Sequence, residues 1–170
     1  MNSEAVSDAV RKQEHPAKPI YRIYNGVDSK RFSPADEITR KKIRQELGLS
    51  DHDVAVAVVA HMKHEVKGHS YLLNAVSQIS KEEKNVKVFL IGDGPLKPSL
   101  EASVKDLGIG GVVQFLGRRT DAAYILKAMD VGCLPSLSEG FSNAVLEYMA
   151  SGLAVVATRV GGNSEVIKNG

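Results

Sequence analysis

Short apolar runs alternate with amphipathic segments through most of this chain. The apolar runs are too short for helices and are rich in valine, isoleucine and leucine, so they predict buried strands. Because they are apolar throughout rather than alternating with polar residues, they are typical of a parallel sheet covered on both faces. The predicted strands cover residues 54–60, 86–91, 112–116, 131–134 and 154–158.

A helix is predicted after each strand, because apolar positions recur there at helical spacing. Strict alternation of strand and helix is the order of an α/β fold with a Rossmann-like, doubly wound parallel sheet. In the usual strand order 3-2-1-4-5, ligands bind beyond the carboxyl ends of the first and fourth strands. The loops 61–69 and 135–143 therefore form the candidate site. The predicted helices cover residues 69–81, 96–107, 121–129, 143–151 and 163–168.

The opening of the chain departs from this alternation. Residues 1–18 are rich in Ser, Glu, Lys and Pro, which predicts a flexible lead-in. Residues 20–24 alternate in the manner of a short strand. Ser33 followed by Pro34 predicts a helix with Ser33 as its N-cap, running to about Leu47.

Residues 19–170 are long enough for a single domain with a substantial core. The last predicted helix has barely begun at Asn169 and Gly170. We therefore expect the domain to continue beyond this sequence.

Composition narrows the partners. The formal net charge of +2 is too small to favour nucleic acid or an acidic membrane surface. Cys133, the only cysteine, lies in an apolar run and is interpreted as a core residue, which is consistent with a reducing, cytoplasmic compartment. No apolar run is long enough to span a bilayer, and peripheral attachment at the inner face of a membrane through another domain stays open.

The loop 61–69 offers a cation at a helix start. Lys67 and Gly68 directly precede the predicted helix, where a lysine reaches a diphosphate as a point charge, helped by the helix dipole. A solvated lysine beside a glycine turn explains the spacing equally well. The three histidines of the loop lack a spacing specific to a metal site.

The loop 135–143 and the helix after it carry two carboxylates. Glu139 precedes the predicted helix and Glu147 lies inside it. An ionised carboxylate only accepts hydrogen bonds, so it suits the hydroxyl pairs of a sugar or a ribose. The alternative is an acidic residue favoured by the helix dipole together with a second one that faces solvent.

Three other segments receive plain interpretations. Gly92-Asp93-Gly94-Pro95 lacks the longer glycine pattern of dinucleotide-binding dehydrogenases and is interpreted as a tight turn. Asp51-His52-Asp53 has the form of a metal-binding motif, but it lies at the amino end of a strand, away from the predicted ligand edge. The basic run 40–44 is interpreted as the solvated face of a helix.

Taken together, these segments resemble the C-terminal, nucleotide-sugar-binding domain of GT-B fold glycosyltransferases of family 4 (glycosyltransferase group 1). The resemblance covers roughly residues 20–170. Its motifs are weak singly and specific in this order and spacing. They are Asn25-Gly26-Val27-Asp28 with Phe32-Ser33-Pro34, Lys67-Gly68-His69, Leu90-Ile91-Gly92-Asp93-Gly94-Pro95, Phe115-Leu116-Gly117-Arg118-Arg119, the segment 139–147, and Val160-Gly161-Gly162 with Glu165.

The resemblance implies roles for individual residues. Glu139 and Glu147 match a pair of family glutamates, the first toward the donor sugar and the second toward the ribose. Lys67 would neutralise the diphosphate leaving group, which makes Glu139 and Lys67 the candidate catalytic residues. Arg119 matches the position whose backbone meets the nucleobase. The candidate donor-binding residues are His61, Lys67, Arg119, Gly140, Phe141, Ser142, Asn143 and Glu147.

One position departs from the family pattern. His61 stands where the family often has an arginine that completes a clamp on the diphosphate, and the loop is about one residue longer. Three alternatives stay open: His61 takes the arginine's place, Lys63 does so, or the clamp relies on Lys67 and the helix dipole.

The implied function is that of a retaining hexosyltransferase. It would use a nucleoside-diphosphate sugar of the UDP or GDP type, with no cofactor and no essential metal, and a glycan or lipid acceptor. The acceptor groups would come from an N-terminal GT-B domain, the expected partner, so the 170 residues alone are expected to be inactive. A sugar-nucleotide epimerase of the same architecture and a non-catalytic nucleotide-binding or protein-interaction module are the competing interpretations.

Overall fold

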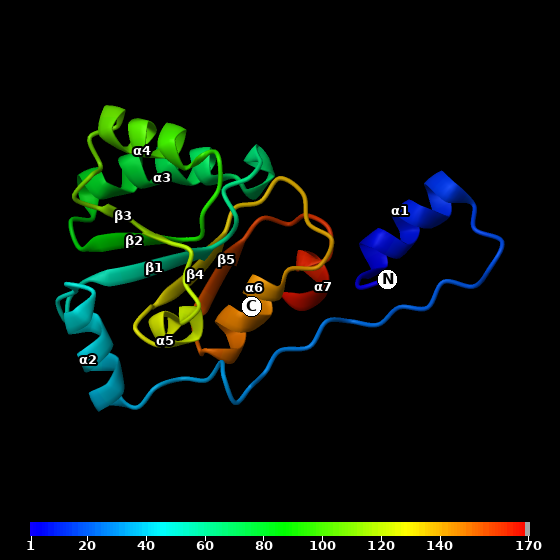
Figure 1. Cartoon of the computed structure of the whole chain (residues 1–170), viewed down its shortest axis with the longest axis horizontal. Coiled ribbons are helices and arrows are strands. Elements are labelled where there is room, and N and C mark those ends of the chain that lie inside the picture. The colour runs from blue at the N-terminus through cyan, green and yellow to red at the C-terminus, as the bar shows by residue number, and fades with distance from the viewer. Residues whose placement is uncertain (169–170) are drawn as a thin grey trace.

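A parallel five-stranded sheet forms the centre of the molecule, in the order β3-β2-β1-β4-β5. The computed structural model describes residues 1–168, and residues 169–170, the end of the predicted domain, lie outside the described residues. The predicted strand order and Rossmann-like fold class are confirmed (Figure 1). The strands are β1 (Val54–Val59), β2 (Val86–Ile91), β3 (Val113–Gly117), β4 (Val131–Leu134) and β5 (Ala154–Ala157).

Helices cover both faces of the sheet, and each face has its own apolar core (Figure 1). Alternate residues of β1 point to opposite faces: Ala55 and Ala57 pack with α2, α5 and α6, whereas Val58 packs with α3 and α4. The helices of the alternating part follow the predicted pattern closely. They are α2 (Glu37–Glu46), α3 (His69–Glu82), α4 (Lys97–Asp106), α5 (Ala122–Leu126), α6 (Asn143–Ala150) and α7 (Asn163–Val166).

Within the lead-in that was predicted to be flexible, residues 4–14 form a helix, which the sequence did not predict. The helix α1 (Glu4–Glu14) begins at the N-cap Ser3, whose hydroxyl accepts a hydrogen bond from the Val6 N–H. The Glu165 carboxylate accepts further bonds from the N–H groups of Glu4 at 2.8 Å and Ala5 at 3.0 Å. These contacts join residues about 160 positions apart, so local composition does not reveal them.

Two further local predictions are wrong. Residues 20–24 form no strand and belong to no sheet of the described residues. The N-cap of α2 is Asp36 rather than Ser33, since the Asp36 carboxylate accepts a 2.8 Å hydrogen bond from the Thr39 N–H. The helix ends at Glu46 with Leu47 as its C-cap, at about the predicted position.

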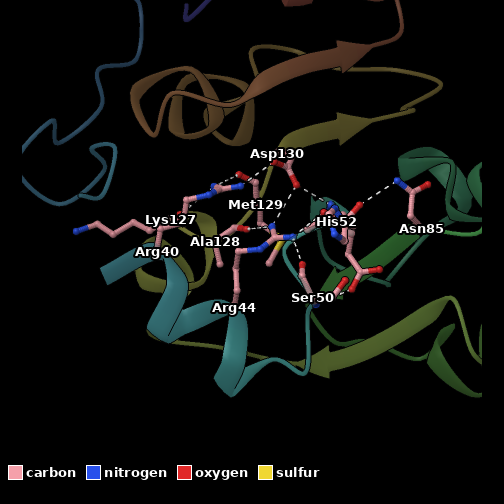
Figure 2. A network of polar contacts seen from close by, with 11 residues as sticks. Arg40, Arg44, Ser50, His52, Asn85, Lys127, Ala128, Met129 and Asp130 are labelled. Carbon is pink, nitrogen blue, oxygen red and sulfur yellow. Dashed lines mark hydrogen bonds and ion pairs between the residues drawn. The ribbon is translucent and has the colours of Figure 1, made fainter. Parts of the chain in front are cut away.

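The basic run of α2 is only in part a solvated face: Lys41 and Lys42 are exposed, as predicted, whereas Arg44 is only 5% exposed. Its guanidinium donates to the carbonyls of Ala128 at 3.0 Å, Ser50 at 2.7 Å and Asp53 at 2.6 Å (Figure 2). It also pairs with the Asp130 carboxylate at 3.3 Å. This network fastens α2 to the amino ends of β1 and β4, on the edge of the sheet opposite the predicted site.

Asp130 is the hub of the same network. Its carboxylate pairs with Arg40 at 2.7 Å and accepts a 2.8 Å hydrogen bond from the Ala55 N–H (Figure 2). The guanidinium of Arg40 donates in addition to the Met129 carbonyl at 2.8 Å. Two arginines and one aspartate thus satisfy backbone groups that the amino ends of the strands would otherwise leave unpaired. Among residues 1–168, no helix has the length and apolar character needed to cross a membrane.

Candidate functional site

A cavity of about 350 Å³ lies where β1 and β4 separate. The two strands share only the pairs Val56–Val131 and Ala57–Gly132, and beyond these the loops that follow them diverge. This is the crevice that the strand order predicts. The cavity is lined by Val59, Ala60, His61, Lys67, Leu134, Glu139, Phe141, Ser142, Asn143, Ala144 and Glu147.

Lys67 and Glu139 form an ion pair inside this cavity, with 2.6 Å between Nζ and Oε1. The Glu139 side chain is 8% exposed and the Lys67 side chain is 29% exposed, so the pair is largely shielded from water. The Ser136 hydroxyl donates a second hydrogen bond of 2.6 Å to the same carboxylate oxygen. The sequence places Lys67 and Glu139 at the same edge of the sheet. Their direct ion pair and the hydrogen bond from Ser136 are known only from the structure.

Glycines allow the loops around Glu139 to approach one another closely. Gly68, with φ at 69°, ends the short helix η1 (Glu65–Lys67), and a Cβ there would overlap the Pro135 carbonyl. Gly161, with φ at 51°, would likewise overlap the Glu139 carbonyl if it carried a Cβ. The Gly162 N–H donates to the Gly140 carbonyl at 2.9 Å. The predicted residue Gly140 therefore lies in the right loop, although it does not line the cavity.

Glu147 lies one turn inside α6 and faces the cavity. Burial raises the pKa of its carboxyl above the ordinary value, and the positive charge of Arg31 partly opposes this shift. A half-buried carboxylate of this kind gains most from a ligand that donates hydrogen bonds. Arg31 was not anticipated from the sequence, because it lies far from the predicted loops.

Two polar contacts stabilise the first turn of α6. The Ser142 hydroxyl caps the helix by accepting from the Val145 N–H at 3.4 Å. The Asn25 amide donates to the Asn143 side-chain oxygen at 2.7 Å. The ring of Phe141 lies 5.5 Å from that of Tyr24. The segment before α2 therefore packs against the residues at the start of α6.

Arg119 belongs to a neighbouring cavity of about 320 Å³. Its guanidinium is held by the Asp121 carboxylate at 2.8 and 2.6 Å, which leaves the side chain occupied. His61 lines both cavities and so stands between Arg119 and the Glu147 side. Lys63 is exposed on the same loop and lines neither of these two cavities.

The histidines of the first loop are not gathered. In the described part of the chain, no group of three or more His, Cys, Asp or Glu side chains is arranged to hold a metal ion. His61 and His64 are exposed, whereas His69 is 1% exposed, and neither of its ring nitrogens has a hydrogen-bond partner. Burial lowers the pKa of His69, with an opposing effect from Glu65.

The buried His69 should make the protein sensitive to acid. The unfolded chain takes up a proton at this imidazole below about pH 6.5, whereas the folded chain resists doing so. Its contribution to stability is therefore present above that pH and lost as the pH falls. We expect His69→Phe to flatten the decline in the free energy of unfolding between pH 7.5 and pH 5, measured by urea titration. The exposed His52, changed in the same way, should leave the decline as steep as in the wild type.

The fold and the cavity together define a class: a Rossmann-like domain whose crevice suits an anionic ligand that also carries hydroxyl groups. Comparison with known proteins gives the family. The chain belongs to the glycosyl transferases group 1, whose family model matches residues 53–170.

Curated relatives agree with this assignment. The chain is 33% identical to a D-inositol 3-phosphate glycosyltransferase of Corynebacterium kroppenstedtii, over 100% of this chain and 40% of the relative. It is also 33% identical to an N-acetyl-alpha-D-glucosaminyl L-malate synthase of Bacillus anthracis, over 98% of this chain and 43% of the relative. The chain therefore spans less than half the length of these relatives.

Solved structures give the same architecture. A crystal structure of Anabaena HepE in complex with UDP and glucose matches 99% of this chain with a TM-score of 0.90 and 28% identity, over 46% of that protein. The C-terminal domain of a glycosyl transferase group 1 protein from Francisella tularensis matches 85% of this chain with a TM-score of 0.74 and 28% identity, over 76% of that domain.

Proposed function

We propose that this chain is the donor-binding part of a retaining glycosyltransferase that transfers a hexosyl group from a nucleoside-diphosphate sugar to a glycan or lipid acceptor. One observation carries the proposal: Lys67, Glu139 and Glu147 come from separate elements and line a single cavity at the switch point of the sheet. A ligand with a sugar, a diphosphate and a ribose requires a cation for the diphosphate and acceptors for the hydroxyl groups of the sugar and the ribose. Lys67 supplies the cation, and the two carboxylates supply the acceptors.

Lys67 is assigned to the diphosphate. It directly precedes the amino end of α3, where the helix dipole adds positive character. As the sugar bond breaks, negative charge accumulates on the departing diphosphate, and a fixed cation beside it lowers the barrier. Lys67 and α3 can supply this charge from the protein itself, so the proposal involves no essential metal.

Glu139 and Glu147 are assigned to hydroxyl groups at the two ends of the donor. Glu139 is held by Lys67 and Ser136 next to the diphosphate position and would contact the sugar. Glu147, deeper along α6, would accept from the ribose hydroxyls. Backbone groups of residues 140–142 would follow the sugar and the phosphates. The backbone at Arg119, on the other side of His61, would meet the base.

The donor is proposed to be of the UDP or GDP type. The complexes of HepE with UDP and with UDP-glucose support a nucleotide-sugar ligand for a domain of this shape. A thermal-shift series with UDP, GDP and ADP tests the proposal directly and identifies the base. Stabilisation by at least one of the nucleoside diphosphates is expected. No response to any of the three at millimolar concentration would contradict it.

The acceptor groups are assigned to an N-terminal GT-B domain, because the chain spans about 40% of its curated relatives. The 170 residues alone are then expected to bind nucleotide and transfer no sugar. In the two-domain enzyme, NMR of the first-formed product should show that the anomeric configuration of the donor is retained. Inversion would contradict the retaining mechanism.

Removing the Glu147 carboxylate should weaken nucleotide binding. Glu147→Ala is expected to cost about 1.5–3 kcal/mol of UDP or GDP binding free energy, the usual size of a charged hydrogen bond. Isothermal titration calorimetry measures this difference. Glu82→Ala, an exposed position at the end of α3, is the matched control and should bind as the wild type does. Equal affinity of Glu147→Ala and wild type would exclude the ribose role.

A further inference from the structure

The ladder between β1 and β4 is bracketed by two side chains. N–H groups along a strand point alternately to its two neighbours, so those of residues 55, 57 and 59 share one direction. The Ala55 N–H donates to the Asp130 carboxylate at 2.8 Å, and the Val59 N–H donates to the Tyr148 hydroxyl at 2.6 Å. Backbone pairing with β4 is confined to the short stretch between these bonds.

Tyr148 reaches this position from beneath the cavity. It follows Glu147 on α6, and its side chain is fully buried in the core on that face of the sheet. The hydroxyl accepts from Val59 on β1 and lies 3.5 Å from the Cys133 carbonyl on β4, to which it donates. One phenol therefore connects both strands at the point where they part.

Gly132 makes room for this ring. A Cβ at Gly132 would overlap the ring of Tyr148, so β4 can pass the phenol only with a glycine at this position. The Tyr148 ring on α6 therefore packs directly against the backbone of Gly132 on β4. The fit fixes Tyr148 laterally, while the two contacts of its hydroxyl fix it along the strands.

We propose that Tyr148 is a positioning residue that props β1 and β4 apart and so sets the width of the donor cavity between His61 and Glu147. The proposal rests on the proposed function for its ligand. Val59, which the phenol contacts, and Leu134, the neighbour of Cys133, both line the cavity, and Glu147 directly precedes Tyr148 on α6. Without the hydroxyl, the Val59 N–H would instead donate to a carbonyl of β4. The two strands would then move closer together, and the cavity would become narrower where Val59 and Leu134 line it.

Tyr148→Phe tests this role, because it keeps the ring and removes only the hydroxyl. We expect UDP or GDP, whichever binds the wild type more tightly, to bind about tenfold more weakly, a change on the scale of one lost hydrogen bond. Tyr71→Phe, which alters an exposed tyrosine of α3, should leave the affinity unchanged. Unchanged affinity of Tyr148→Phe would overturn the proposal.

Two measurements separate positioning from a loss of stability. Val104 is a buried residue of α4. Val104→Ala should lower the free energy of unfolding while nucleotide affinity is retained. Hydrogen exchange followed by NMR should show the Val59 amide protected in the wild type and exposed in Tyr148→Phe, with Ala57 protected in both.

The exchange experiment also distinguishes this inference from the proposed function. A wild-type chain that binds no nucleoside diphosphate would refute the function, while protection of Val59 that depends on Tyr148 would still support the prop. Should Tyr148→Phe fail to fold, the wild type alone decides: slow exchange at Val59 supports the contact, and exchange at the rate of a free amide overturns it.

Discussion

Replacing Arg44 with methionine should lower the free energy of unfolding by about 3–5 kcal/mol, the cost typical of breaking a buried charged pair. Arg44 is 5% exposed, and its guanidinium donates to three carbonyls besides pairing with Asp130. Methionine fills much of the volume and makes none of these bonds. The Ala128 carbonyl would then be buried without a donor, and the Asp53 carbonyl would lose its bond to Arg44, whereas the Ser50 carbonyl still accepts from the Asp53 N–H at 3.3 Å.

Urea unfolding of Arg44→Met measures this loss. Lys42→Met is the matched control, because Lys42 is exposed on the same helix, and it should change stability by less than about 0.5 kcal/mol. Arg44→Lys should recover little of the lost free energy of unfolding, since a single ammonium cannot reach all the acceptors that surround the planar guanidinium. A methionine variant as stable as the control would contradict the structural role of the network.

The sheet could be predicted almost completely from the sequence. Buried parallel strands need apolar residues on both faces, so runs such as 54–59 and 86–91 are visible without knowledge of their neighbours. The strand order followed from the preferred topology of alternating strands and helices.

Long-range contacts explain the errors. The first N–H groups of α1 donate to Glu165, near the other end of the chain, and the sequence around residues 1–18 does not reveal this contact. The run 40–44 has the charge of a solvated face, but Arg44 is buried because Asp130 and three carbonyls receive it. Residues 20–24 have a strand's alternation without a strand to pair with.

For the candidate site, the sequence predicted that the charged residues meet, although Arg119 lines the neighbouring cavity and Gly140 lines neither. Lys67, Glu139 and Glu147 converge because the ends of adjacent parallel strands share an edge. Their mutual geometry was not predictable, since an ion pair depends on side-chain rotamers and loop packing. The pairing of Lys67 with Glu139 and the link from Tyr148 to Val59 are of this kind.

The Lys67–Glu139 pair leads to the largest expected effect on binding. Lys67→Met should weaken UDP or GDP binding more than a hundredfold, because it removes a charged contact worth about 1.5–3 kcal/mol and leaves Glu139 as an unpaired negative charge. That carboxylate, 8% exposed, would then face the diphosphate with only Ser136 as a partner. Calorimetric titration of the folded variant measures the loss.

A double mutant separates these two contributions. UDP and GDP carry no donor sugar, so the proposed sugar contact of Glu139 does not enter their affinity. Adding Glu139→Gln to Lys67→Met removes the repulsion and should restore part of the binding. With Glu139→Gln alone measured as well, the four affinities give a coupling energy between the two sites. Lys63→Met, an exposed lysine of the same loop, should bind within about twofold of wild type, because the side chain lines no part of this cavity. A loss at Lys63 as large as that at Lys67 would instead assign the diphosphate to Lys63. Equal affinities of the single and double mutants would mean that the unpaired Glu139 does not repel the nucleotide.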